Sequence, residues 1–213
     1  MSKVANLFPL FLKLEGKRCL VVGAGLVGLE KIESLLRCGA SVRVVAPDAV
    51  AGVQELHAHG SIEWLPRHYH PEDPEGCHLV IAATNDREVN QAIFLEASRR
   101  SILCNTVDDP PLCDFFFGSI VQRGDLQIAI STAGESPAVA QRLRREIDAQ
   151  LPADLGPWLA EVGHLRREVL QAMPPGEERK ALLHELAHRE VCSSPACPAR
   201  VYAAVAARQE VRP

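Results

Sequence analysis

Short apolar runs alternate with amphipathic stretches along the first half of the chain. The apolar runs that predict strands are 18–22, 41–46, 61–65, 78–83 and 101–105. Helical periodicity follows the first, second and fourth of these runs, at 26–38, 49–59 and 88–100. Runs that are apolar throughout are typical of strands buried on both faces of a parallel sheet. The alternation predicts an α/β fold with a doubly wound parallel sheet and right-handed crossovers.

The pattern changes after Asp109-Pro110-Pro111. Two strand-like runs, 115–122 and 126–131, are joined by Arg123-Gly124-Asp125, which is a hairpin signal. A helix is then predicted as far as Gln150, with Ser136 as its N-cap and Pro137 at its first position. One hairpin and one helix are too small to bury a core of their own. We interpret this part as a small α+β element that completes a dimer interface.

The remaining residues are polar and helical in pattern. Prolines and small residues interrupt them at 174–176 and 193–198. We therefore expect three domains: a sheet domain at 1–112, a dimerisation domain at 113–150 and a helical C-terminal domain at 151–213.

A glycine-rich turn lies between the first predicted strand and the first predicted helix. Its sequence is Gly23-Ala24-Gly25-Leu26-Val27-Gly28. The first glycine permits a tight turn, Gly25 lets backbone N–H groups approach a pyrophosphate, and Gly28 lets the helix pack closely on the strand. The positive end of the helix then faces the phosphate charge. This context predicts a Rossmann-type domain that binds a dinucleotide; a glycine turn without a ligand is the alternative.

Polar residues follow four of the predicted strands, and in a doubly wound sheet such positions line one cleft. They are the glycine turn, Pro47-Asp48, Thr84-Asn85-Asp86 and 106–109. Asp48 has the spacing from the glycines at which an acidic residue binds the adenosine ribose, and it equally has the position of a helix N-cap. The end of that strand has Arg43 but no basic cluster, which favours NAD over NADP.

Asp108 is the candidate for acid–base chemistry. It lies in a loop at the expected cleft, where a carboxylate can take a proton as a hydride leaves to a nicotinamide. The alternative is that Asp108 or Asp109 only caps the turn before the two prolines. The place of Asp108 in the sequence does not decide between the acid–base role and the capping role.

A second loop of small residues, Ser131 to Pro137, precedes the helix of the dimerisation element. Its free N–H groups and hydroxyls could bind a substrate carboxylate, and the candidates are Ser131, Thr132, Gly134 and Ser136. Arg144, within the first turns of that helix, could receive an anionic group. The alternative is a capped helix with a solvated basic face.

Composition narrows the class of protein. The formal net charge of −4 argues against a broad nucleic-acid-binding surface. No apolar run approaches the roughly 18 residues that span a bilayer, and the N-terminus has no signal-peptide cleavage pattern. Seven cysteines, an odd number, are scattered through predicted strands and helices, which is typical of reduced thiols. We expect a cytoplasmic protein with no nucleic-acid and no membrane partner.

One motif points to a different chemistry. His184-Glu185-Leu-Ala-His188 matches the HExxH signature of zinc proteases. No third ligand follows at a recognised spacing, and the segment is polar and rich in charged residues. Cys192 and Cys197 also lack partners that would complete a metal site. We expect no resident metal.

Several separated motifs, in order, resemble the precorrin-2 dehydrogenase / sirohydrochlorin ferrochelatase family, which includes the N-terminal module of bifunctional siroheme synthases. The resemblance covers about residues 4–150. The matching stretches are Phe8-Pro-Leu-Phe11, Val21 to Gly28 with Glu30-Lys31, Ala82 to Asp86 with Val89-Asn-Gln91, Cys104 to Asp108, Ser119-Ile120, and Ser131 to Pro137 with Leu143-Arg144.

The resemblance implies a Rossmann domain, a small dimerisation domain and a helical C-terminal domain. It implies NAD-dependent oxidation of precorrin-2 to sirohydrochlorin, with Asp108 as the catalytic aspartate. It places NAD against the glycine turn, including Leu26 and Val27, and against Pro47-Asp48. Thr132 stands where some bifunctional members carry a phosphorylated serine, which leaves regulation there open.

Other activities stay open at this stage. Some family members also insert Fe²⁺ into sirohydrochlorin, and the same aspartate could take the protons that leave the pyrrole nitrogens. The methyltransferase half of the bifunctional enzymes has no counterpart in this sequence, so we do not expect synthesis of precorrin-2. A non-catalytic, NAD-sensing regulatory domain is the rival from another class.

Overall fold

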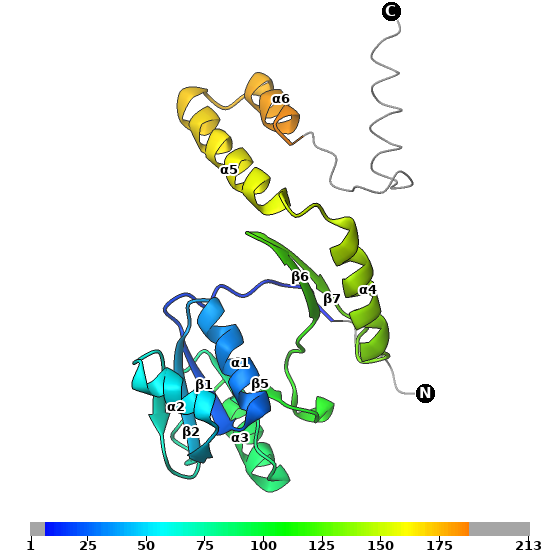
Figure 1. The fold of residues 1–213 in the computed structure, drawn as a ribbon. Coiled ribbons are helices and arrows are strands. Elements are labelled where there is room, and N and C mark those ends of the chain that lie inside the picture. The colour runs from blue at the N-terminus through cyan, green and yellow to red at the C-terminus, as the bar shows by residue number, and fades with distance from the viewer. Residues whose placement is uncertain (1–6, 188–213) are drawn as a thin grey trace, which may run out of the picture. The chain divides into compact units, whose positions relative to one another are not determined.

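The computed structural model describes residues 7–187, which fall into two units (Figure 1). One unit is Phe8–Phe116; the other holds Leu7 and residues 117–187. Among these residues no helix has both the length and the apolar character that crossing a membrane requires.

The first unit is built on a five-stranded parallel sheet with the strand order β3-β2-β1-β4-β5. Its strands are β1 Arg18–Ala24, β2 Ser41–Ala49, β3 Glu63–Leu65, β4 Leu79–Ala82 and β5 Leu103–Thr106. Its helices are α1 Leu26–Arg37, α2 Ala51–Ala58 and α3 Arg87–Arg99, followed by a 3₁₀ turn, η1, at Pro110–Leu112. The chain winds outward from β1 to β3 and then returns to the other side of β1, which confirms the doubly wound fold.

Apolar packing on both faces explains why the strand sequences show no polar alternation. Cys19 and Val21 of β1 pack with residues of α1 and α2 on one face. Leu20 and Val22 pack with Ile93 and Ala97 of α3 on the other. Successive strand residues point to opposite faces, so a strand covered on both sides needs an apolar residue at every position.

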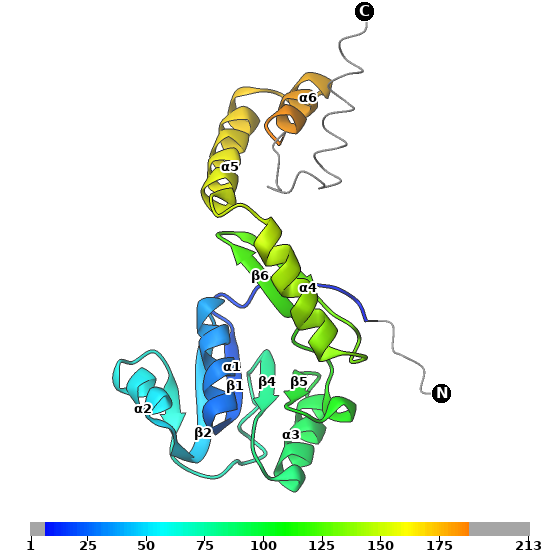
Figure 2. The ribbon, with the colours of Figure 1, turned by 45° about the vertical axis from the view of Figure 1, so that its right-hand side comes forward.

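The second unit begins with the predicted hairpin. Strands β6 Ser119–Arg123 and β7 Leu126–Ile130 are antiparallel, and Arg123 pairs with Leu126 across Gly124-Asp125. Helix α4, Pro137–Gln150, lies beside this hairpin (Figures 1 and 2). Its N-terminus is as predicted, because Pro137 is at the first position and the Ser136 hydroxyl accepts a hydrogen bond from the Val139 N–H. Helices α5 Leu155–Ala172 and α6 Glu177–Glu185 follow.

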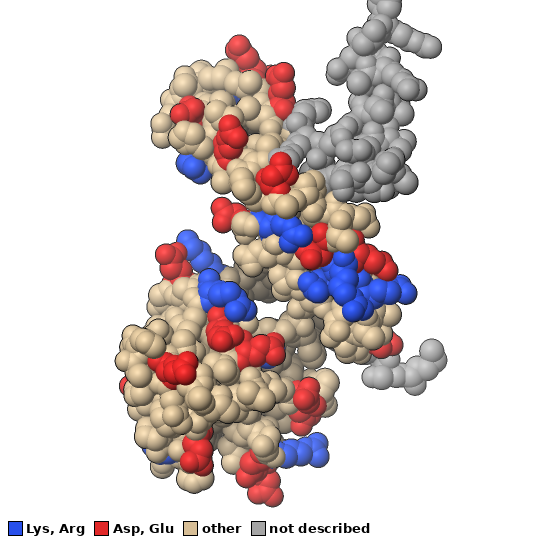
Figure 3. Space-filling view, viewed as in Figure 1, with Lys and Arg blue, Asp and Glu red and all other residues tan. Residues whose placement is uncertain are grey.

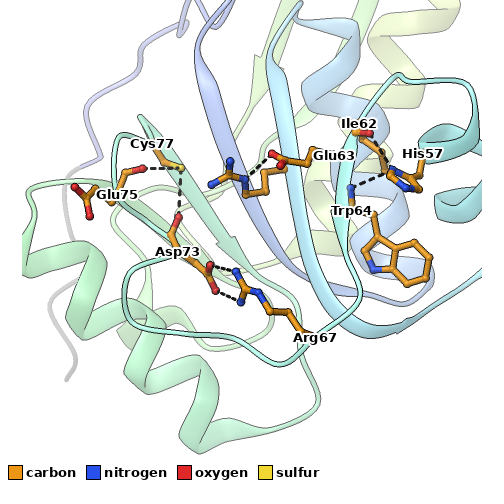
Figure 4. A network of polar contacts seen from close by, with 9 residues as sticks. His57, Ile62, Glu63, Trp64, Arg67, Asp73, Glu75 and Cys77 are labelled. Atoms are coloured by element: carbon orange, nitrogen blue, oxygen red, sulfur yellow. Dashed lines mark hydrogen bonds and ion pairs between the residues drawn. The ribbon is translucent and has the colours of Figure 1, made fainter.

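The loop between β3 and β4 is held by an ion pair that the sequence analysis did not find (Figure 4). The Asp73 carboxylate, 5% exposed, accepts two hydrogen bonds from Arg67, at 2.5 and 2.9 Å, and a third from the His70 N–H at 2.8 Å. Burial alone would raise the pKa of Asp73. The hydrogen bonds from Arg67 and His70 outweigh burial and lower this pKa below its usual value.

We expect Asp73→Asn to lower the free energy of unfolding by about 2 kcal/mol at pH 7. This is less than the ~3–5 kcal/mol for breaking a fully buried pair, because the Arg67 side chain is 39% exposed and can be hydrated. A group with a lowered folded-state pKa stabilises above its unfolded pKa of about 3.9 and loses that effect as the pH falls through the folded value. Urea unfolding at pH 7 and pH 3 should therefore show the difference between wild type and variant narrowing at the lower pH. Glu72→Gln, at an exposed neighbouring carboxylate, is the control; a difference that persists undiminished in acid would contradict the assignment.

Candidate functional site

The glycine turn is shaped by close contact with the end of β4. Gly23 has a φ of +104°, and a Cβ added there would lie 2.3 Å from the Ala83 carbonyl oxygen. A Cβ on Gly28 would lie 2.3 Å from the Gly23 carbonyl oxygen. Both positions therefore require glycine for the turn and the helix packing, as the sequence analysis expected.

Gly25 is different, because nothing lies within 4 Å of the place where its Cβ would be. It is the N-cap of α1 and has no side chain to cap the helix. The first helical hydrogen bond runs from the Leu29 N–H to the Gly25 carbonyl, so the N–H groups of Leu26, Val27 and Gly28 have no helical acceptor. Leu26 and Val27 are 78% and 45% exposed. Open space in front of unpaired N–H groups at a helix N-terminus fits the pyrophosphate of a dinucleotide.

The end of β2 differs from expectation, because the strand extends to Ala49. Val22 pairs with Val45, but Ala24 pairs with Ala49, so the register shifts and Pro47-Asp48 bulges out of the ladder. Helix α2 begins at Ala51 with Val50 as its N-cap. The N-cap interpretation of Asp48 is therefore wrong, since the strand continues past it. Pro47 and Asp48 are exposed at the carboxyl edge of the sheet, and the ribose contact stays a prediction.

Arg43 is not at the end of β2. It lies near the start of the strand, where its Nε is 2.7 Å from Glu63 of β3. A shallow hollow of about 270 Å³ at this opposite edge is lined by polar residues that include Arg18, Ser41 and Arg43. Because doubly wound sheets bind ligands at the carboxyl edge, we assign this hollow no role in the site.

Thr84 and Asn85 follow β4 and differ in how they are used. The Thr84 hydroxyl lies 2.7 Å from Asn90 Oδ1 and accepts a hydrogen bond from the Asp86 N–H at 3.2 Å. Asn90, almost fully buried in α3, also donates to the Thr84 carbonyl at 3.0 Å. Asp86 caps α3. Thr84 therefore holds the loop in place, and the exposed Asn85 is the residue of this pair whose side chain faces solvent.

Asp108 lies in the turn after β5, with an exposed side chain and a φ of +59°. The Asp109 N–H closes the turn with a bond of 3.3 Å to the Thr106 carbonyl. Asp109 is the N-cap of η1 but its side chain makes no capping bond; it pairs instead with Arg87, at 3.5 Å. Among the described residues the Asp108 carboxylate has no hydrogen-bond or ion-pair partner. The turn-capping interpretation is therefore not supported for either aspartate.

These residues share one edge of one unit. The strands of the sheet are parallel, so the glycine turn, Pro47-Asp48, Asn85 and Asp108 all follow carboxyl ends. The strand order reverses between β1 and β4, and such a switch point is where doubly wound sheets bind ligands. The arrangement can hold a dinucleotide and presents the Asp108 carboxylate as a candidate proton acceptor.

The loop from Ser131 to Ser136, in the other unit, satisfies many of its own polar groups. The Ser131 hydroxyl accepts from the Ala133 N–H at 3.1 Å, and the Thr132 hydroxyl accepts from the Ser136 N–H at 3.2 Å. Ala133 and Gly134 have positive φ. Since the Ser136 side chain and carbonyl take the Val139 and Ala140 N–H groups, fewer N–H donors are open at the start of α4 than the sequence analysis expected.

Basic side chains gather over α4 (Figure 3). They are Arg142, Arg144 and Arg145. Arg142 lies 3.3 Å from Glu146, whereas Arg144 is half-buried. The hydroxyls of the loop and Arg144 stay predictions as groups that receive a substrate carboxylate.

The HExxH motif is described only in part. His184 is exposed near the end of α6, and His188, Cys192 and Cys197 lie outside the described residues. Within residues 7–187, no three His, Cys, Asp or Glu side chains are grouped as metal ligands.

Comparison with known proteins gives two matching family models. Residues 10–119 match the model described as "Putative NAD(P)-binding". Residues 123–150 match "Sirohaem biosynthesis protein central". The predicted class of cofactor, an NAD(P) dinucleotide, agrees with the first of these.

Curated relatives are siroheme synthases. The chain is 45% identical over 172 residues to "Siroheme synthase 1" of Yersinia enterocolitica, which covers 81% of this chain and 36% of the relative. It is 41% identical over 172 residues to "Siroheme synthase" of Methylococcus capsulatus, with the same two coverages. The chain thus spans little more than a third of the length of these relatives.

Among solved structures the chain is similar to "SirC, precorrin-2 dehydrogenase". The TM-score is 0.75 at 23% sequence identity, and the match covers 95% of this chain and 100% of that one. At this identity the likeness confirms the fold.

Proposed function

Since this chain belongs to the NAD(P)-binding family of siroheme biosynthesis proteins, we propose that it oxidises precorrin-2 to sirohydrochlorin with NAD. The observation that carries the proposal is an exposed Asp108 carboxylate, without a partner in the described part of the chain, at the same sheet edge as the open glycine turn. The substrate is taken from the siroheme synthase relatives and from the precorrin-2 dehydrogenase whose fold the chain shares.

NAD, when bound, supplies the two-electron acceptor. The chain's own contribution begins with the N–H groups of Leu26, Val27 and Gly28, which bind the pyrophosphate at the N-terminus of α1. In the proposal Asp48 and Pro47 hold the adenosine ribose, and Thr84 and Asn85 add polar contacts at the end of β4. No basic side chain of the described residues is paired with Asp48, and we keep NAD, rather than NADP, as the proposed cofactor.

Asp108 takes the proton that leaves precorrin-2 as the substrate is oxidised. A free carboxylate suits this role, because no protein donor competes for its oxygens. The substrate carries several carboxylates, and we propose that Ser131, Thr132, Gly134, Ser136 and Arg144 bind one of them. Charge-assisted bonds to Arg and hydroxyl donors recognise such groups.

Absorbance spectroscopy tests the proposal. The purified protein is given precorrin-2 and NAD under anaerobic conditions, first without metal and then with Fe²⁺. Appearance of sirohydrochlorin together with NADH in the first stage is the expected result. An enzyme-dependent change to siroheme in the second stage would add Fe²⁺ as a substrate. Absence of change in both stages would remove the enzyme proposal in favour of an NAD-binding regulator.

We also propose that the protein is a homodimer that pairs through the open face of the hairpin. Ile120, 44% exposed, and Ala129 lie opposite each other on this face, while Val121 is buried on the α4 face. The same face also carries the exposed pair Gln122 and Gln127. An isolated two-stranded sheet is marginally stable, and a second copy that covers the Ile120–Ala129 pair would stabilise it.

Ile120→Glu is therefore expected to convert the dimer into a monomer, because it places a charge at the centre of the covered face. Sedimentation velocity at several protein concentrations measures this. Gln141→Glu, on an exposed position of α4, makes a similar charge change and should remain dimeric. A wild-type protein that stays monomeric at every concentration would refute the dimer.

The cysteines agree with a cytoplasmic location, which we retain as part of the proposal. Five cysteines are described, and all five are free thiols, as is typical of a reducing compartment.

A further inference from the structure

The Cys113 side chain contacts the turn that carries Asp108. The Cys113 Sγ lies 3.1 Å from the Thr106 carbonyl oxygen and 3.4 Å from the Asp109 carbonyl oxygen. Thr106 and Asp109 are the residues on either side of Val107-Asp108. One thiol therefore contacts the backbone on both sides of the aspartate.

Cys113 is itself held in place by the sheet. It forms an isolated antiparallel bridge with Asn105 of β5. The buried Asn105 side chain donates to the Phe115 carbonyl at 2.8 Å and to Cys113 Sγ at 3.4 Å. Asp114 bonds to both backbone groups of Cys104, at 2.8 and 2.9 Å. Residues 113–115, which follow η1, are thus hydrogen-bonded back to β5.

The Asp108 side chain has no such support. Its carboxylate has no polar partner among the described residues, and its backbone is in the left-handed region at φ +59°. Aspartate adopts this region more readily than most residues, but the conformation persists only where the surroundings impose it. The backbone of the turn therefore fixes the direction in which the Asp108 side chain leaves the chain. The contacts of Cys113 hold that backbone together with the bonds from the Val107 N–H to the Ala82 carbonyl and from the Leu112 N–H to the Asp109 carbonyl.

We propose that Cys113 is a positioning residue for Asp108: its single S–H, shared between the Thr106 and Asp109 carbonyls, holds the turn from which the catalytic carboxylate projects. This rests on the proposed function, since it assumes that Asp108 takes the proton.

The chemistry of the thiol agrees with this role. A thiol donates through its S–H, whereas a thiolate would repel the two carbonyl oxygens. Burial raises the pKa of Cys113 above its usual value, so the group keeps its proton at neutral pH. Cys113 therefore acts as a hydrogen-bond donor and not as a nucleophile.

The test measures kcat for precorrin-2 oxidation, the Kd for NAD and hydrogen exchange of the 106–114 segment in Cys113→Ala, Cys113→Ser and wild type. Removing the thiol should lower kcat at least about tenfold, as a small misplacement of a reacting group does, and leave the Kd for NAD unchanged. The backbone amides of the 106–114 segment should exchange hydrogen faster than in the wild type. The serine variant keeps a donor on a shorter bond and should recover part of both losses. Cys38→Ala, at an exposed cysteine, should behave as wild type.

A double-variant experiment separates positioning from general stability. The Asp108→Asn variant lacks the carboxylate that Cys113 is proposed to position, so adding Cys113→Ala to it should lower kcat no further. An equal loss in both backgrounds, or a wild-type kcat in Cys113→Ala, overturns the positioning role while the proposed function stands. A wild-type protein that does not oxidise precorrin-2 at all overturns the proposed function, and the role of Cys113 with it.

Discussion

Asp108→Asn is expected to slow the oxidation of precorrin-2 by about 10²- to 10⁴-fold, the contribution that a positioned general base makes. The amide cannot accept the proton, although it has the same shape as the carboxylate. The Kd for NAD should be almost unchanged, because the residues that we propose for NAD binding follow β1, β2 and β4, whereas Asp108 follows β5. Anaerobic assays of sirohydrochlorin formation, with NADH titrations beside them, measure both quantities.

Asparagine is the informative substitution because of the backbone at this position. Asp108 has a φ of +59°, which asparagine adopts about as readily as aspartate, whereas alanine pays roughly 1–2 kcal/mol. A loss of activity in the asparagine variant therefore reports the chemistry and not a displaced turn. Asp125→Asn, in the exposed loop between β6 and β7, is the matched control and should keep wild-type turnover. Full activity in Asp108→Asn would show that another group takes the proton.

Gly23→Ala is expected to abolish measurable NAD binding and to lower the free energy of unfolding by about 2–5 kcal/mol. A left-handed backbone adds roughly 1–2 kcal/mol for a residue with a Cβ. The Cβ would also lie 2.3 Å from the Ala83 carbonyl, and relieving such overpacking by moving the backbone costs about 1–3 kcal/mol. Both effects act on the turn that joins β1 to α1.

Gly25→Ala separates binding from folding at the same turn. Its φ of −78° is ordinary for alanine, and no atom lies within 4 Å of the new Cβ. The fold should therefore keep its stability, while the methyl group fills the space proposed for the pyrophosphate and raises the Kd for NAD at least about tenfold. Thermal unfolding measures the stability of the variant, and fluorescence titration with NADH measures its affinity for the cofactor. Gly163→Ala in α5 is the control. Unchanged NAD affinity in Gly25→Ala would place the pyrophosphate elsewhere.

Local patterns accounted for the elements of this protein and their order. The apolar runs gave the strands of the sheet to within a few residues because a strand buried on both faces leaves a continuous apolar signature. The hairpin at Gly124-Asp125, the Ser136 cap and the close contact of Gly28 with Gly23 each depend on residues within a few positions of one another. Their physical causes are therefore contained in a short stretch of sequence.

Contacts between distant residues decided the rest. The bulge at Pro47-Asp48 depends on how β2 meets β1, so the sequence pattern wrongly allowed Asp48 as a helix cap. Thr84 is predicted to contact the cofactor, which stays a prediction, and only the structure shows that its hydroxyl also bonds to Asn90, six residues along. The Arg67–Asp73 pair and the thiol of Cys113 likewise had no periodic signal, because each depends on a loop folding back.

The sequence by itself determined that this chain forms a doubly wound sheet with a glycine turn for a dinucleotide and an aspartate after β5, since these features follow from local periodicity and backbone sterics. Only the tertiary structure decided which polar groups are free to act. Within residues 7–187, Asp108 and the first N–H groups of α1 have no partner, while Thr84, Asp73 and Asp109 are engaged. Whether a polar group is available depends on what packs against it, and that is a property of the folded chain.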